Sequence, residues 1–184
     1  VRTRLVRYAL KAAREAKLRT SWVAPSADYE KIINEFVGAI LEPREDAPFL
    51  TDVARLVGYV APIGMANTLA RVVLHLTSPG TPDLYQGDEQ LAFTLVDPDN
   101  RGQIDYDNYS RALEEVESPA WPDDASRSKL FVVRRLLALR RERSDLFRDG
   151  SYMPIQAVGC KAEHVVAFAR IHGDRRELSV VTRL

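Results

Sequence analysis

The sequence has a single cysteine, Cys160, and no excess of charge of either sign. Its 26 basic and 26 acidic side chains give a formal net charge of zero, which argues against a protein whose main partner is a nucleic acid or another polyanion. One cysteine cannot form a disulfide within the chain, so we expect a cytoplasmic protein. No segment approaches the roughly 20 consecutive apolar residues of a membrane helix. We therefore expect neither a membrane span nor a signal peptide.

The remaining composition is that of a soluble globular protein. Hydrophobic residues make up 46% and charged residues 28% of the 184 residues, enough for one domain or for one domain and part of another. The chain is helical in pattern within a few residues of Val1, and it stops directly after a strand-like run at 178–182. We therefore expect it to be a piece of a longer protein.

Apolar residues at helical spacing predict a mainly helical body of about five helices. Ser26 is the expected N-cap of the clearest amphipathic helix, with Asp28 in its first turn. Pro62 is expected to separate two helices, the second of which is apolar nearly all round and should be buried. The five predicted helices are 4–17, 26–40, 50–61, 63–76 and 126–144, the last with Ser126 as its cap, and 111–116 is a candidate for a further short helix.

Between and after these helices the pattern changes. A short strand is predicted at 83–85, closed by Gly87, and a long polar loop at 88–109. After Gly150 the chain predicts strands at 152–158, 164–171 and 178–182, with a hairpin tip at 172–175. The fold class expected is mainly α with a small antiparallel β element, in two regions, 1–149 and 150–184.

Three segments carry a resemblance to a known family. Residues 79–89 read PGTPDLYQGDE, residues 95–101 read LVDPDNR, and the stretch 14–30 contains REAK, TSW, Pro25 and Tyr29-Glu30. The first segment resembles the eighth barrel strand of the α-amylase superfamily. Together with the second it is similar to maltooligosyltrehalose synthases in particular, and the third looks like the helical insertion of the same family.

The resemblance implies a fold and a reaction. The chain would be a fragment of a (β/α)8 barrel enzyme, comprising the last strand and helix and the helical insertion, followed by the start of the C-terminal β-sandwich. The enzyme would rearrange the reducing-end α-1,4 linkage of a maltooligosaccharide into an α,α-1,1 linkage, with no cofactor. In the superfamily the three catalytic carboxylates lie on barrel strands four, five and seven, which precede strand eight. We therefore assign no catalytic residue to this chain.

Substrate contacts are expected on the loop after the last barrel strand, because barrel enzymes bind substrates at the C-terminal ends of their strands. Gly87 would allow a sharp turn there, and carboxylate, amide and guanidinium groups suit sugar hydroxyls. The predicted substrate-binding residues are Tyr85, Gln86, Glu89, Asp97, Asp99, Arg101 and, as a stacking surface, Trp22. The alternative is that Asp97, Asp99, Asn100 and Arg101 make only Asx turns and a salt bridge, and that Trp22 and Trp121 are packing residues.

Other chemically capable residues have structural explanations. His75 lies in an apolar helix and is expected to be a hydrogen-bonded core residue. His164 and His172 lack metal-ligand spacing, so no metal site is predicted. The arginines of 134–143 are expected to form a solvated face or salt bridges, and Cys160 to be inert.

Three hypotheses follow for the function. The chain is the C-terminal part of a trehalose-forming isomerase and is inactive alone, or a non-catalytic module that binds α-glucans, or a helical interaction domain that uses the arginines of 134–143. The neutral net charge and the acidic loop at 83–107 argue against the interaction domain. We also expect the barrel-facing surfaces to drive homodimer formation of the isolated chain.

Overall fold

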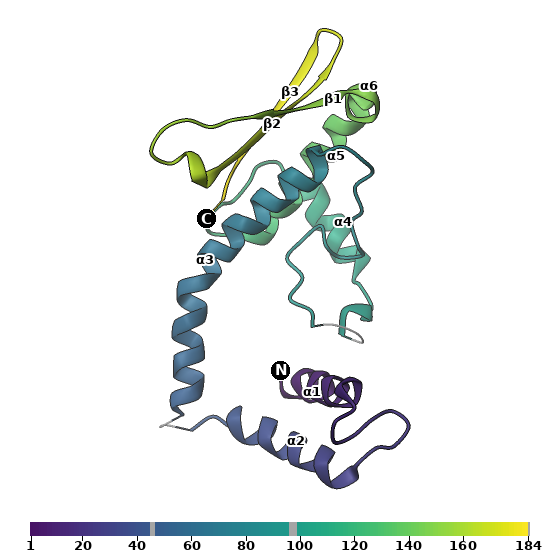
Figure 1. The fold of residues 1–184 in the computed structure, drawn as a ribbon, viewed down its shortest axis with the longest axis vertical. Helices are drawn as coiled ribbons and strands as arrows, with labels where there is room; N and C mark the ends of the chain where they lie inside the picture. The colour runs from purple at the N-terminus through teal and green to yellow at the C-terminus, as the bar shows by residue number, and fades with distance from the viewer. Residues whose placement is uncertain (45–46, 96–98, 184) are drawn as a thin grey trace. The chain divides into compact units, whose positions relative to one another are not determined.

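The structure, a computed structural model, describes residues 1–44, 47–95 and 99–183. Helices take up 56% of the chain, and the strands form one three-stranded antiparallel sheet (Figure 1). The predicted mainly α fold with a small antiparallel β element is therefore confirmed. The elements are α1 Arg2–Ala16, α2 Ala27–Ile40, α3 Pro48–Thr77, η1 Asp99–Arg101, α4 Tyr106–Glu115, α5 Ala125–Glu142, α6 Ser144–Asp149, β1 Ser151–Ile155, η2 Ala162–His164, β2 Val165–His172 and β3 Arg175–Thr182.

The chain divides into two compact units, each built from two stretches of sequence. The first unit comprises Val1–Tyr59 and Phe93–Gln103, and the second comprises Val60–Ala92 and Ile104–Leu184. The predicted boundary at 149/150 concerns domains of a longer enzyme rather than these units, and it stays a prediction.

In the first unit α1 packs against α2. Helix α1 ends at Lys17, whose left-handed φ of 57° turns the chain toward α2. Ser26 is the N-cap residue of α2 and Asp28 lies in its first turn, as predicted. Among the described residues of this unit only Thr20 and Val37 are fully buried. Apolar burial therefore contributes little to this unit.

Helix α3 corrects two predictions. The expected break at Pro62 does not occur, because Pro62 lies inside one helix of 30 residues. An interior proline costs about 3 kcal/mol, which the many other helical hydrogen bonds outweigh. The helix is also not buried all round. Its fully buried residues are Val72, Leu76 and Thr77, on the side where Val133 of α5 packs against it.

The same helix corrects the expectation that no segment is as long and apolar as a membrane helix. By length and hydropathy alone α3 could cross a membrane, but core helices of soluble proteins pass the same test. The sequence-based expectation failed because Pro62 was taken to end the helix, which left two segments that were each too short. Whether the chain contacts a membrane stays a prediction.

The second unit has an apolar core between α3 and α5. Two helix starts there differ from the prediction. Helix α5 is capped by Asp124, whose side chain accepts from the Arg127 amide. Helix α4 begins five residues before the predicted position because Asp105 caps it by accepting from the Asn108 amide. The sequence also gave no sign of α6, which follows α5 after one residue. The core residues are Val72, Leu76 and Val133, with Leu84, Val132 and Leu136 packed against them.

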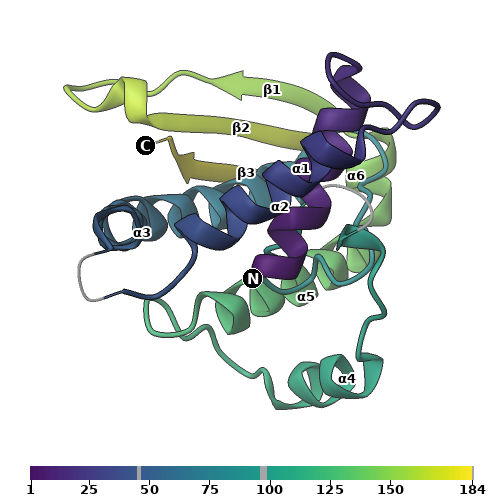
Figure 2. The same ribbon diagram turned by 90° about the horizontal axis from the view of Figure 1, so that it is seen from below.

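The sheet has the order β1-β2-β3, and Figure 2 shows the three strands side by side. The hairpin between β2 and β3 turns at Gly173, with His172 opposite Arg175, as the sequence predicted. Helix α6 packs on β2, and Phe168 and Arg170 of that strand are buried. The sheet is thus joined to the helical part of the second unit through α6.

Candidate functional site

The predicted substrate loop begins with a tight turn at residues 85–88. The Asp88 amide donates to the Tyr85 carbonyl over 2.9 Å, and Gly87 has a φ of 82°, as in a type II turn. The positive φ favours glycine, and a Cβ at position 87 would also lie 3.0 Å from Cδ1 of Ile104, which would have to shift slightly. The turn leaves Tyr85 half exposed and Gln86 exposed. The sharp turn predicted at Gly87 is confirmed.

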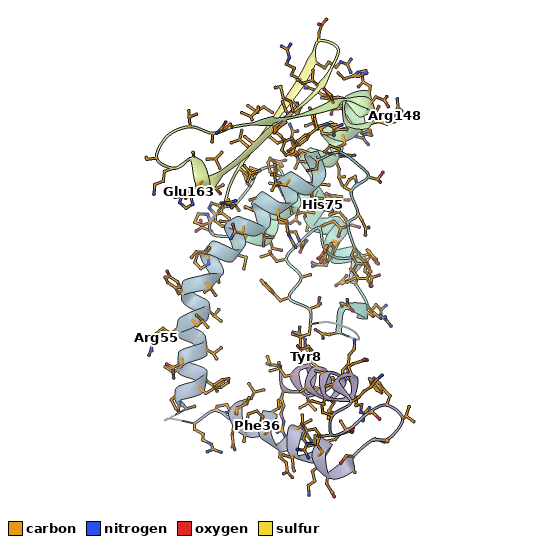
Figure 3. All side chains as sticks on the ribbon, in the orientation of Figure 1. Tyr8, Phe36, Arg55, His75, Arg148 and Glu163 are labelled. Carbon is orange, nitrogen blue, oxygen red and sulfur yellow. The ribbon has the colours of Figure 1, made fainter. Side chains whose placement is uncertain are left out.

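The strand predicted at 83–85 does not form, and these residues have no regular secondary structure. A strand needs a neighbour to pair its backbone groups, and the described residues provide none next to this segment. One contact here comes from His75, whose Nε2 accepts from the Asp83 amide over 3.3 Å. His75 is exposed on α3 (Figure 3). The expectation of a core histidine is therefore wrong, because this face of α3 is uncovered.

Three side chains of the second unit hold the loop beyond the turn. The Tyr109 hydroxyl donates to the Gly87 carbonyl over 2.9 Å. The Lys129 ammonium donates to the Gln90 carbonyl over 2.8 Å, and the Ser126 hydroxyl accepts from the Leu91 amide over 3.2 Å. Ser126 is thus not the cap of α5, as had been predicted, but an anchor for this loop.

Two of these anchors have shifted pKa values. Burial lowers the pKa of Lys129, and nearby Asp88 partly offsets that shift. Burial also raises the pKa of Tyr109, and the negative charges of Glu89 and Asp88 add to the rise. Glu89, a predicted sugar contact, is partly buried and lines a pocket of about 600 Å³ with residues of α4 and α5. The apolar residues Leu113, Leu130 and Val133 are among those that line this pocket.

Asp99 belongs to the first unit and is held by Arg4 of α1. The Arg4 Nε lies 2.9 Å and its Nη2 2.7 Å from the two carboxylate oxygens of Asp99, and the carboxylate also accepts from the Leu95 amide over 2.7 Å. The Arg4 hydrogen bonds, followed by that of Leu95, lower the pKa of Asp99. A salt bridge at Asp99 agrees with the structural alternative, although the sequence analysis did not name Arg4 as the partner. A sugar contact by Asp99 stays a prediction.

The neighbours of Asp99 are described only in part. Arg101 ends the short helix η1 and is exposed. The side-chain oxygen of Asn100 is buried without a hydrogen-bond partner among the described residues. Asp97 lies outside the described residues, so its predicted role is not addressed.

Trp22 follows α1 in the first unit and is 56% exposed. Its indole Nε1 donates to Oε1 of Glu15 over 3.1 Å, and the Arg14 guanidinium carbon lies 4.8 Å from the ring centroid. Arg14 in turn makes two hydrogen bonds to Glu30, of 2.8 and 2.5 Å. The Thr20 hydroxyl donates to the same carboxylate over 2.6 Å. Trp22 is therefore not a core residue.

The predicted sugar-binding residues are divided between the two units. Tyr85 and Gln86 lie in the turn at 85–88 of the second unit and Glu89 follows it directly, whereas Trp22, Asp99 and Arg101 belong to the first unit. The contacts of Arg14 and Glu30 were missed by sequence reasoning, although both residues lie in the segment that carries the family resemblance. Their opposite charges, on either side of a turn between two helices, were the signal available.

Of the five arginines of 134–143, Arg134, Arg135 and Arg141 are exposed, so the predicted solvated face is present in part. Arg134 donates to the carbonyls of Leu113 and Val116, and Arg140 donates to those of Leu76 and Gly80. Arg143, the residue after α5, pairs with Glu177 over 2.9 Å, and this is a salt bridge of the predicted kind. Among the described residues there is also no cluster of three or more His, Cys, Asp or Glu side chains that could hold a metal ion.

Comparison with known proteins gives a consistent result. No family model matches the sequence. Over 170 residues the chain is 38% identical to a Mycobacterium tuberculosis protein, found in two strains, whose name assigns it provisionally to the maltooligosyl trehalose synthases. The match covers 92% of this chain but only 20% of that protein, so the chain spans about a fifth of the length of these relatives.

Solved structures agree with the sequence comparison. The maltooligosyltrehalose synthase of Arthrobacter ramosus matches all of this chain and 23% of its own, at 36% identity and a TM-score of 0.83. A further maltooligosyl trehalose synthase crystal structure matches 98% of this chain and 24% of its own, at 28% identity and a TM-score of 0.84. The chain is therefore similar, over nearly its whole length, to the C-terminal part of maltooligosyl trehalose synthases.

Proposed function

We propose that this chain is the C-terminal part of an enzyme that rearranges the reducing-end α-1,4 linkage of maltooligosaccharides to an α,α-1,1 linkage, in the cytoplasm, as a step of trehalose formation. The observation that carries the proposal is the similarity to synthases of this kind over 92% or more of the chain. Those relatives are named as synthases of maltooligosyl trehalose, and the reaction is the one that the family resemblance implies.

Within that enzyme we assign this chain to substrate binding rather than to bond breaking. The exchange of one glycosidic linkage for another needs two carboxyl groups on either side of the anomeric carbon, about 5 Å apart when the configuration is retained. The family resemblance places such carboxylates on barrel strands four, five and seven, and two carboxylates of this chain are held in ion pairs. Asp99 is paired with Arg4, and Glu30 is paired with Arg14. The half-exposed Tyr85 and the exposed Gln86 are instead available to sugar hydroxyls.

A two-part experiment tests this assignment. The purified chain is incubated with maltopentaose, and loss of reducing ends is measured together with calorimetric binding. We expect measurable binding and no non-reducing product. Gln86→Ala should weaken binding by several-fold, because it removes a hydrogen-bonding amide from the turn. Gln103→Ala, an exposed amide of the first unit, is the matched control and should bind as the unaltered chain does.

The outcomes separate the two halves of the proposal. Conversion of maltopentaose by this chain would contradict its assignment to binding alone. Absence of any calorimetric heat at millimolar maltopentaose would contradict the sugar-binding role.

A further inference from the structure

We propose that Glu15 and Arg14 are positioning residues that hold Trp22 as a stacking surface for one glucose unit of the maltooligosaccharide. The inference rests on the proposed function, and it adds the two residues that fix the ring and the face that receives the sugar. It concerns only the first unit, in which all of these residues lie.

The edge of the indole is fixed by Glu15. Its carboxylate accepts the Nε1 hydrogen of Trp22 over 3.1 Å, although both residues are exposed. A tryptophan at the surface otherwise rotates freely about its two side-chain torsions. A hydrogen bond from the ring edge removes most of that freedom before any ligand arrives, which lowers the entropic cost of binding.

One face of the indole is covered by Arg14. The guanidinium carbon lies 4.8 Å from the ring centroid, within the range of a cation–π contact. Because one face is occupied while Trp22 remains 56% exposed, the open face is the opposite one. Aromatic rings carry negative charge on their faces, and the C–H groups on one side of a glucose ring are weakly positive, so the two surfaces are complementary.

Arg14 can act as a support because it is itself anchored. It makes two hydrogen bonds to Glu30, whose carboxylate also accepts from the buried Thr20. The Ser26 amide donates to the Thr20 hydroxyl over 3.0 Å. The hydrogen bonds from Arg14, and then from Thr20, lower the pKa of Glu30 to about 2. The pair is therefore charged throughout the neutral range, and the ring is supported by α1 and α2 together.

The chain allows a direct test because it has only two tryptophans. In a Trp121→Phe background the emission comes from Trp22 alone. Its fluorescence anisotropy reports ring mobility, and titration with maltopentaose reports the affinity. Glu15→Ala should lower the anisotropy and weaken maltopentaose binding by up to about tenfold, as expected for one lost hydrogen bond. Glu15→Gln keeps an oxygen that accepts the indole hydrogen, and it should restore both values to within about twofold.

Arg14→Lys provides a second variant that tests the covered face. Lysine keeps a charge opposite Glu30 but loses the planar group that stacks on the ring, so we expect lower anisotropy with α1 and α2 still formed by circular dichroism. The matched control is Lys11→Ala, which removes a different cation from the same helix. It should change neither the anisotropy of Trp22 nor the circular dichroism.

The results distinguish this inference from the proposed function. If the chain binds maltopentaose by calorimetry while Glu15→Ala matches the unaltered chain in anisotropy and affinity, the positioning role is wrong and the proposed function stands. If Trp22 emission does not respond to bound maltopentaose, the stacking surface is wrong. If the unaltered chain binds no maltopentaose at all, the sugar-binding proposal and this inference both fail.

Discussion

The first unit and the second unit are each stabilised by a different kind of internal interaction. In the first unit Thr20 and Val37 are the only fully buried residues described, and helix contacts depend on the ion pairs of Arg14 with Glu30 and of Arg4 with Asp99. In the second unit an apolar core joins α3 to α5, and the buried residues extend into α6 and β2. Apolar burial dominates the stability of most domains, so we expect the second unit to be the more stable.

Arginine shows the difference most clearly. In the first unit Arg4 and Arg14 pair with carboxylates. In the second unit Arg134, Arg140 and Arg170 donate to backbone carbonyls at or just after the C-terminal ends of α4, α3 and α6. The C-terminal carbonyls of a helix have no partner within the helix and carry partial negative charge. In the second unit arginine therefore serves both as a helix cap and in ion pairs, such as that of Arg143 with Glu177, whereas in the first unit it serves in ion pairs.

The largest expected effect is the removal of a capping arginine. Arg170 is 1% exposed, and its Nη2 donates to the carbonyls of Leu146, Phe147 and Gly150 over 3.3, 3.0 and 2.8 Å. Arg170→Ala would leave a cavity and uncapped carbonyls, and should lower the free energy of unfolding of the second unit by about 3 kcal/mol. Hydrogen exchange of the β2 amides in urea measures the change.

The control for this prediction is Arg176→Ala on β3, whose side chain is exposed and whose loss should stay within about 0.5 kcal/mol. Arg170→Met tests the mechanism further. It fills most of the space and removes a buried cation that has no carboxylate partner, so it should cost less than Arg170→Ala. Equal unfolding free energies for Arg170→Ala and Arg176→Ala would refute the capping role.

How far the sequence predicts each region depends on the range of the interactions. Helices α1 and α2 and the β2–β3 hairpin were predicted closely, because helical periodicity, Ser26 and Gly173 are local signals. The break at Pro62 was wrong because a local rule was applied to a helix long enough to outweigh it. The segment 83–85 was expected to be a strand in the whole enzyme and irregular without its sister strands, and it is irregular in this chain because strands depend on neighbours.

The candidate site follows the same division. The turn at Gly87 was predicted from the sequence, since a positive φ favours glycine. The Tyr109 hydroxyl holds the Gly87 carbonyl, and in the first unit Arg14 is paired with Glu30. Both contacts join residues that are distant in sequence, and only the fold brings these together. Sugar contacts, the domain boundary and homodimer formation stay predictions.

The second largest expected effect is a difference between the two units in how their stability depends on pH. The pKa of Glu30 in the folded chain is about 2, against an ordinary value of 4.5. An unfolded chain therefore binds a proton here at higher pH than the folded chain does. The stability that Glu30 contributes is complete above about pH 4.5 and is lost as the pH falls toward 2. The amides of α1 and α2 should lose hydrogen-exchange protection between pH 4.5 and 2.5, while those of β2 and β3 change less.

Glu30→Gln is the control for the acid experiment, because it cannot bind a proton in this range. Its α1 and α2 amides should be less protected at pH 7 and should change little on acidification. Equal loss of protection in both units of the unaltered chain would contradict the proposed difference between them.

The smallest expected effect is the loss of stability on removal of a helix cap, which can be compared between one helix of each unit. The side chain of Asp124 accepts from the Arg127 amide at the start of α5 over 2.8 Å, whereas Ser26 at the start of α2 makes no side-chain capping bond. Asp124→Ala should therefore cost about 1 kcal/mol and Ser26→Ala only a few tenths. The contact of the Ser26 amide with Thr20 uses the backbone and survives in Ser26→Ala. Hydrogen exchange at the first turn of each helix measures both values. A cost for Ser26→Ala as large as that for Asp124→Ala would mean that the hydroxyl does cap α2, and that the first unit depends less on its ion pairs than the comparison implies.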